Sequence, residues 1–184
     1  MLEGLAAADA LPVVNAMTDV NHPCEVLADL YALRSGGDIG SLRYLFVGPD
    51  GNIARVWQEA ARVLSLDLVQ CCPAEVATPA EVATPAGVTP GTRWTDDLAS
   101  AIRTADVIIT DGPGPHADLL APYRITAALL DTAPAGARLN PCPPFIRGVE
   151  VAADAIEHRA FVGHGFKAAL LPVQQAVMAH CLGL

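Results

Sequence analysis

The sequence predicts an α/β fold, with a single Rossmann-like, doubly wound parallel sheet and helices on both of its faces. Apolar runs of strand length alternate along the chain with segments of helical spacing. Strands that alternate with helices pair in parallel and are covered on both sides. The chain has 184 residues, 52% hydrophobic and 17% charged, which is enough for one α/β domain with its own core.

Each element is predicted from its local pattern. Strands are expected at 43–47, 66–72, 106–110 and 137–139, with a fifth at 160–162. Helices are expected at 54–64, 98–104, 125–130 and 167–182. The segment 74–90 has low complexity, because Ala74–Pro79 repeats at once as Ala80–Pro85, and we expect a surface loop there. Parallel sheets bind ligands outside the carboxyl ends of their strands, so the informative loops follow Val47, Thr110 and Leu139.

Charge and composition exclude several classes of function. The formal net charge of −9 argues against nucleic acid or an anionic membrane as the main partner, because both require clustered lysine and arginine. There is no apolar run of the ~18–20 residues that a membrane span needs, and no basic leader segment is visible. The five cysteines form no C-x-x-C pair, so we expect no metal, no cofactor and a reduced, cytoplasmic location.

Short motifs occur in a recognisable order along the chain. Leu11–Asn15 followed by His22–Leu30 is similar to V-P-V-I-N … H-P-x-Q-x-L-x-D-L, and Gly48–Asn52 stands where a G-D-x-N-N loop would be. Thr110 and Asp111 match the start of T-D-x-W, Tyr123–Thr126 matches Y-x-(I/V)-(N/T), and Pro141–Val151 resembles H-C-L-P-x-x-R-G-x-E-V. Together, from about residue 11 to 178, they resemble the second domain of the aspartate/ornithine carbamoyltransferase family.

The resemblance implies a domain organisation. Residues 1–184 would form a single amino-acid-binding domain, with 11–35 as the former interdomain helix region and 74–90 as the low-complexity loop. The S-x-R-T-R loop with which the family grips the phosphate of carbamoyl phosphate does not occur in the sequence. We therefore expect the carbamoyl-phosphate-binding domain to be absent, and this chain not to be a self-sufficient transcarbamoylase.

The expected catalytic residues are His22, Glu25, Asp111 and Cys142. By resemblance, His22 would polarise a carbonyl oxygen, although it could instead pack at a helix start. Glu25 replaces the family's glutamine one turn further on, where it could act with His22 as acid and base, or simply favour the helix N-terminus. Asp111 would bind a substrate ammonium, or be a turn residue. Cys142 could be a nucleophile or a buried inert thiol.

The expected substrate-binding residues are Asn52, Thr110 and Arg147. Asn52 would contact a substrate carboxylate or amide, or else cap the helix that follows it. Thr110 precedes Asp111 in the retained part of the T-D-x-W motif, and Arg147 is a candidate carboxylate clamp. The family's histidine in H-C-L-P is replaced by Pro141, so the site departs from the family pattern.

Three functions stay open. The first is a repurposed enzyme of small-molecule biosynthesis that uses acid–base chemistry, such as cyclisation, isomerisation or elimination, on a substrate with amino or carboxyl groups. The second is the amino-acid-binding subunit of a split ornithine/aspartate carbamoyltransferase, and the third is a catalytically dead binding module. A homodimer, or a partner chain over the face of the missing domain, is expected to cover apolar positions of two helices: Leu27, Leu30, Tyr31, Leu170, Leu171, Val173, Val177 and Met178.

Overall fold

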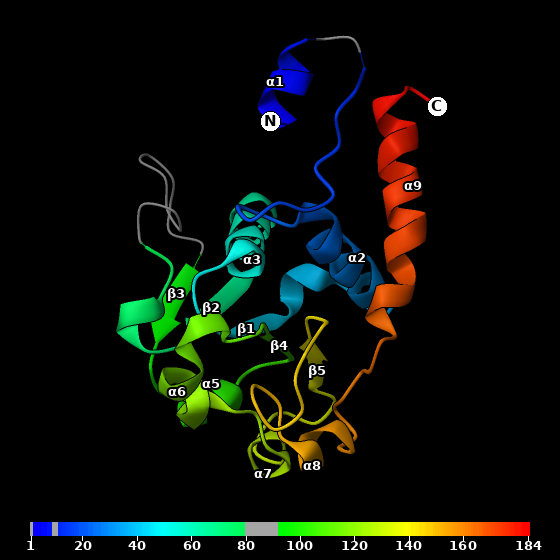
Figure 1. Ribbon diagram of the computed structural model, residues 1–184. Coiled ribbons are helices and arrows are strands. Elements are labelled where there is room, and N and C mark those ends of the chain that lie inside the picture. Colours follow the sequence, from blue (N-terminus) through cyan, green and yellow to red (C-terminus); the bar gives the residue numbers. More distant parts are fainter. Residues whose placement is uncertain (1, 9–10, 80–91) are drawn as a thin grey trace.

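A computed structural model describes residues 2–8, 11–79 and 92–184, and its centre is a five-stranded parallel sheet (Figure 1). The spatial order is β3-β2-β1-β4-β5. The strands are β1 (Arg43–Val47), β2 (Asp67–Cys71), β3 (Thr92–Thr95), β4 (Val107–Thr110) and β5 (Arg138–Pro141).

Helices cover both faces of the sheet. One layer contains α2 (Pro23–Arg34) and α3 (Asn52–Leu64), and α9 (Leu170–Cys181) packs against α2. The opposite layer contains α5 (Leu98–Ile102), α6 (Ala117–Leu120), α7 (Ala127–Leu130) and α8 (Ala153–Ile156), as Figure 1 shows. The short α1 (Leu2–Ala7) stands away from both layers in the same view, and the 3-10 turn η5 (Phe166–Ala169) leads into α9.

Alternation along β1 explains how one strand supplies two cores. Tyr44 and Phe46 pack with Trp57 of α3 in one buried cluster, whereas Leu45 and Val47 pack with Ile102 of α5 in the other. Successive side chains of a strand point to opposite faces, so a central strand of a doubly covered sheet is apolar at every inner position. The predicted α/β fold with helices on both faces is therefore confirmed.

The prediction for the fifth strand was wrong. Residues 160–162 form only an isolated bridge, in which Phe161 pairs with Leu139, and Gly163 then turns the chain at a φ of +61°. The fifth strand is β3, a short edge strand whose Arg93 and Trp94 are exposed and which therefore lacks an apolar run. Of the predicted loop at 74–90, residues 74–76 form a 3-10 turn, and 80–90 lie outside the described residues.

The strand order creates a switch point between β1 and β4. The chain runs outward from β1 through β2 to β3, and then returns to the other side of β1 for β4 and β5. Ligands of such sheets bind outside the carboxyl ends of the strands at this point. Among the helices that the structure describes, none is both long and apolar enough to cross a membrane.

Candidate functional site

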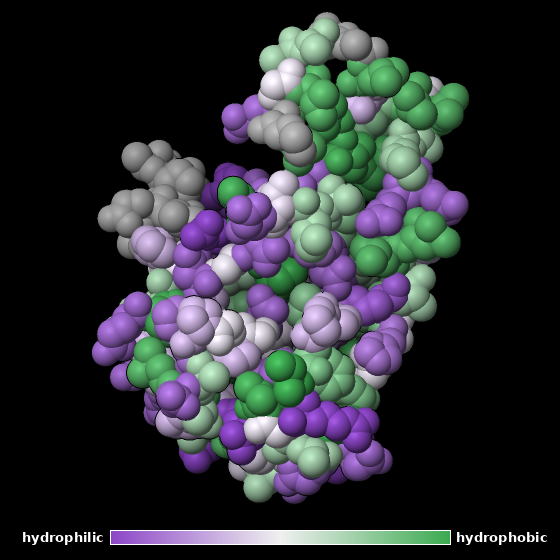
Figure 2. Space-filling view, in the orientation of Figure 1, coloured by the Kyte–Doolittle hydropathy of each residue, from purple (hydrophilic) through white to green (hydrophobic). Residues whose placement is uncertain are grey.

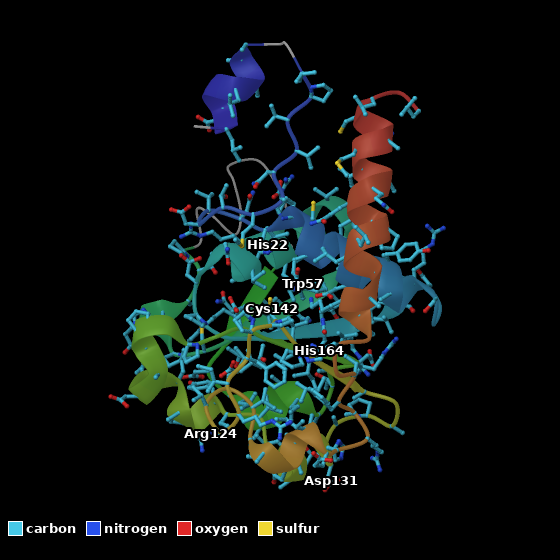
Figure 3. The ribbon with its side chains drawn as sticks, turned by 45° about the vertical axis from the view of Figure 1, so that its right-hand side comes forward. His22, Trp57, Arg124, Asp131, Cys142 and His164 are labelled. Atoms are coloured by element: carbon cyan, nitrogen blue, oxygen red, sulfur yellow. The ribbon has the colours of Figure 1, made fainter. Side chains whose placement is uncertain are left out.

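The start of α2 brings two of the expected residues to the carboxyl end of the sheet. His22 is the N-cap residue and Pro23 occupies the first turn, where its missing N–H costs nothing. The His22 side chain makes no capping hydrogen bond, and its Nδ1 is buried without a partner among the described residues. Figure 3 places His22 on the same side of the sheet as Cys142 and above it.

Glu25 belongs to a buried ionic cluster that the sequence did not predict. Lys167 Nζ lies 2.7 Å from Glu25 Oε1 and 2.6 Å from Asp29 Oδ1, and all three side chains are almost fully buried. Burial raises the pKa of Asp29, and the charge and hydrogen bond of Lys167 oppose that rise. The two carboxylates outweigh burial at Lys167, whose pKa is raised. Glu25 is therefore paired with a lysine, and among the described residues no hydrogen bond or ion pair joins it to His22.

Lys167 is the functional candidate that the sequence reasoning missed. It lies in η5, and it is the single lysine of the chain, against ten arginines. That scarcity was the available signal, because Lys167 is the one ammonium side chain among basic residues that are otherwise all arginine. Three-way burial of one cation with two anions needs good geometry to offset its desolvation cost.

Cys142 follows directly on β5, next to this cluster. Its Sγ lies 3.9 Å from Glu25 Oε1, at the long end of contact for a thiol. Burial is the main cause that raises the pKa of Cys142, and the charge of Asp111 adds to it. Because the thiolate is the nucleophilic form, this environment disfavours Cys142 as a nucleophile near neutral pH.

Asp111 follows β4 and lies at the switch point. Its Oδ1 accepts a hydrogen bond of 2.8 Å from the backbone N–H of Gly112. Burial raises the pKa of Asp111, and the charges of Glu150 and Glu25 raise it further. The Gly112 hydrogen bond and the charge of His22 oppose that rise. The carboxyl group is thus poised to bind a cation or to exchange a proton.

A small pocket opens beside Asp111. The cavity measures about 20 Å³. Glu150, which is 9% exposed, supplies its second carboxylate; Oε1 accepts from the Ile146 N–H at 2.8 Å, and Oε2 is buried with no partner in the described part of the chain. The complete lining is Val47, Gly48, Asp111, Pro113, Ala117, Leu120, Tyr123, Val149 and Glu150.

The expected substrate-binding residues are less closely grouped. Asn52 starts α3, and its amide Nδ2 donates to the Thr18 carbonyl at 2.9 Å, so it ties the segment before α2 to the sheet edge. Thr110 is buried, and its Oγ1 has no hydrogen-bond partner within the described ranges. Arg147 is exposed on the loop after β5, and the pocket lining does not include it.

The arrangement combines acid–base groups with a place for a cation. Buried atoms of His22, Thr110 and Glu150 have no hydrogen-bond partner among the described residues. Thr110 ends β4, and the charges of His22 and Glu150 act on the neighbouring Asp111. Buried polar atoms without partners mark sites for water or ligand. In residues 2–8, 11–79 and 92–184, we find no group of three or more metal-binding side chains.

Comparison with known proteins shows which family the chain resembles in sequence and structure. Residues 41–181 match the model of the family "Aspartate/ornithine carbamoyltransferase, Asp/Orn binding domain". An ornithine carbamoyltransferase of Nitrobacter winogradskyi is 32% identical over 192 aligned positions, which cover 99% of this chain and 62% of that protein. For one from Syntrophus aciditrophicus, identity is 33% over 85% of this chain and 56% of that protein.

Solved structures agree with the sequence comparison. The crystal structure of ornithine carbamoyltransferase from Burkholderia thailandensis superposes with a TM-score of 0.90 at 29% identity, over 98% of this chain and 61% of that one. The chain thus spans about three fifths of the length of the relatives it matches. Because the family model covers most of its residues, the chain belongs to the aspartate/ornithine carbamoyltransferase family and matches that family's Asp/Orn-binding domain.

Proposed function

We propose that this domain binds a small molecule carrying a primary amine and performs acid–base chemistry on it, as a member of its family repurposed for small-molecule biosynthesis. The observation that carries the proposal is the convergence of Asp111, His22, Glu25 and Cys142 near the switch point. Carboxylates in a partly buried pocket favour a cation, and the relatives that share this fold are ornithine carbamoyltransferases.

The proposed chemistry divides the work between two groups. Asp111 would bind the ammonium or take a proton from it, and His22 would move a proton through its unpartnered Nδ1. Cyclisation, isomerisation and elimination all need one group that removes a proton and another that returns it. Glu25 and Lys167 would hold the local charge in place, since their ion pair occupies the carboxylate that would otherwise act as the base.

The proposal is tested with the purified chain and a panel of short aliphatic amines and amino acids, with and without carbamoyl phosphate, followed by proton NMR. We expect conversion without carbamoyl phosphate, lost in Asp111→Asn and retained in Asp118→Asn, whose carboxylate is exposed on the neighbouring α6. A ureido product that requires carbamoyl phosphate would instead establish transcarbamoylation, and saturable binding with no conversion would favour a binding module.

A second candidate is the amino-acid-binding part of a split or larger transcarbamoylase, and one observation favours it. An apolar groove of about 410 Å³ runs between α2 and α9. Its lining is Leu27, Tyr31, Pro172, Val173, Ala176, Val177 and His180. Figure 2 shows further hydrophobic surface over the upper part of the molecule, where the segment before α2 and the end of α9 lie in Figure 1.

In a transcarbamoylase, another domain or chain would cover this groove. For the first proposal, in which the chain acts without a carbamoyl-phosphate domain, we propose a second copy of the chain as occupant of the groove. Apolar patches beyond a few hundred Å² rarely stay uncovered, and a two-fold pair is the commonest arrangement of identical chains. Leu27 is 44% exposed whereas Leu30 is 5% exposed, so Leu27→Asp probes the interface without entering the core. Light scattering should give about twice 19.1 kDa for the unaltered chain and a lower mass for the variant. A mass near 19.1 kDa at every concentration would leave the groove to a different chain.

A further inference from the structure

The N-terminal helix α1 buries none of its residues in the described part of the chain, and Leu5 is 56% exposed. Figure 1 shows the helix standing away from both helix layers. Leu2, Leu5 and Ala6 follow the i, i+3, i+4 spacing, so they lie on one apolar side of the helix. Isolated helices shorter than ~12–15 residues are marginal in water. This helix therefore needs a surface against which its apolar side can pack.

The groove between α2 and α9 is a surface of matching chemistry. Within the described residues its lining comes from α2 and α9 alone, so α1 does not occupy it in its own chain. The lining is mostly apolar, and it contains His180 and no acidic residue, whereas Glu3 is the one charged side chain of α1. An apolar helix side that lies in an apolar groove is a common mode of recognition between chains.

The segment between α1 and α2 is long enough to carry α1 to another molecule. Asn15 Nδ2 donates to Asn21 Oδ1 at 2.5 Å, and the Asn52 amide binds the Thr18 carbonyl at 2.9 Å, so this part of the segment is held beside α2 and α3. Leu5 precedes Asn15 by ten residues. An extended chain spans at most ~3.3–3.6 Å per residue, which gives a reach of roughly 35 Å from Asn15.

The outer side of α9 favours a second copy over the chain's own α1. Leu171, Met178 and Leu182 are exposed, and their helical spacing places them on the side of α9 away from the buried Val173. An α1 that folded back on its own chain would cover the groove and leave this outer side exposed. A second copy brings surface for both, and apolar patches of this kind are rarely left uncovered.

We propose that α1 of one copy lies in the α2–α9 groove of a second copy, and that the two chains exchange these helices around a two-fold axis. The inference rests on the second copy proposed above for this groove, and it is independent of the chemistry proposed for Asp111. It names the segment of the second copy that fills the groove. Leu2 and Leu5 would then be buried between the two helices, α2 and α9, that form the groove.

Leu5→Asp tests the contact by sedimentation over a dilution series. Leu5 is exposed in its own chain, so the variant should fold, and an aspartate in the groove should weaken dimerisation at least about tenfold. The matched control is Leu119→Asp, which changes an exposed leucine of α6 in the opposite layer and should leave the dimer intact. A Leu5→Asp dimer as tight as the unaltered one, with Leu27→Asp still weakening it, would overturn the exchange and leave the second copy in the groove. A monomer at every concentration would overturn both.

A disulfide between two variants shows whose groove α1 occupies. Cys181 is the exposed cysteine, so both variants also carry Cys181→Ser, and the other four cysteines are buried. Chains with Ala6→Cys and chains with Ala176→Cys are mixed at low concentration, concentrated so that dimers form again, and oxidised. We expect more linked species of about twice 19.1 kDa in the mixture than either variant gives alone. No more linkage in the mixture than in the separate variants, or a disulfide that forms only within one doubly substituted chain, would show that the exchange is wrong.

Discussion

Lys167 should be the side chain on which the stability of the site depends most. Replacing it in Lys167→Met keeps the apolar stem and removes the charge, which leaves Glu25 and Asp29 buried without their counterion. The side chains of the three residues are 12%, 8% and 3% exposed, so solvent can do little to screen the two carboxylates. Removing one partner of a buried ion pair costs roughly 3–5 kcal/mol, which for a domain of this size lowers Tm by roughly 6–20 °C.

The loss should depend on pH in a definite direction. Burial already raises the pKa of Asp29, and Lys167 is the group that holds it down. In Lys167→Met the folded-state pKa of Asp29 therefore rises further above its unfolded value. A raised folded-state pKa gives stability that is present below the unfolded pKa and lost as pH rises through the folded one. The deficit of the variant should be largest near pH 7 and shrink as pH falls toward about 4.

Urea denaturation followed by tryptophan fluorescence, to which the buried Trp57 and the exposed Trp94 both contribute, measures this deficit at several pH values. The matched control is Arg93→Met, which removes the cation from an exposed ion pair with Asp67 and should change stability little. If Lys167→Met lost no more stability than the control at pH 7, or if its deficit stayed constant with pH, the cluster would not be an internally compensated ion set.

Three further outcomes are expected. Iodoacetamide should label the exposed Cys181 of the native protein within minutes and spare Cys142, whose pKa burial raises; mass spectrometry showing equal rates would restore Cys142 as a nucleophile candidate. Because burial also raises the pKa of Asp111, amine binding should strengthen as pH rises through that pKa, and Asp111→Asn should weaken binding about 10–100-fold while abolishing that pH dependence in calorimetry. Asn52→Ala should speed hydrogen exchange around Thr18 and leave amine binding intact; loss of binding would return Asn52 to the ligand.

The sequence predicted the fold where one strand or helix carries its own signal. Residues 44–47 and 107–109 are apolar on both faces, so the sequence alone predicts central strands there. The edge strand β3 has no such signal, since Arg93 and Trp94 are exposed and its structure follows from pairing with β2. Residues 160–162 are apolar for a different reason, because Ala160 and Phe161 pack in the core from a bend beside Leu139.

The candidate site was predictable only in its linear motifs. The resemblance of short motifs to the family pattern gave His22, Glu25, Asp111 and Cys142 as candidates, and each stands at the end of a strand or the start of a helix. The contact between Glu25 and Lys167 joins residues from opposite ends of the chain, and local pattern carries no information on it. A sequence also does not show which hydrogen bonds a side chain makes within the protein. Asn52 was therefore expected to contact a ligand, whereas its amide donates a hydrogen bond to a backbone carbonyl.

Glu25, which departs from the family motif, has to be interpreted together with Lys167. A carboxylate where the family motif has a neutral glutamine would, by itself, be a buried anion that is stable only when it is protonated or paired with a cation. Lys167 supplies the cation at 2.7 Å, so Glu25 is compensated and cannot easily act as a free base. The acid–base capacity of the site then falls to His22, whose Nδ1 is unpartnered within the described residues, and to Asp111, whose pKa is raised. Because these two residues reach the switch point from α2 and β4, proton transfer and amine binding would share one location, and loss of Asp111 should impair both.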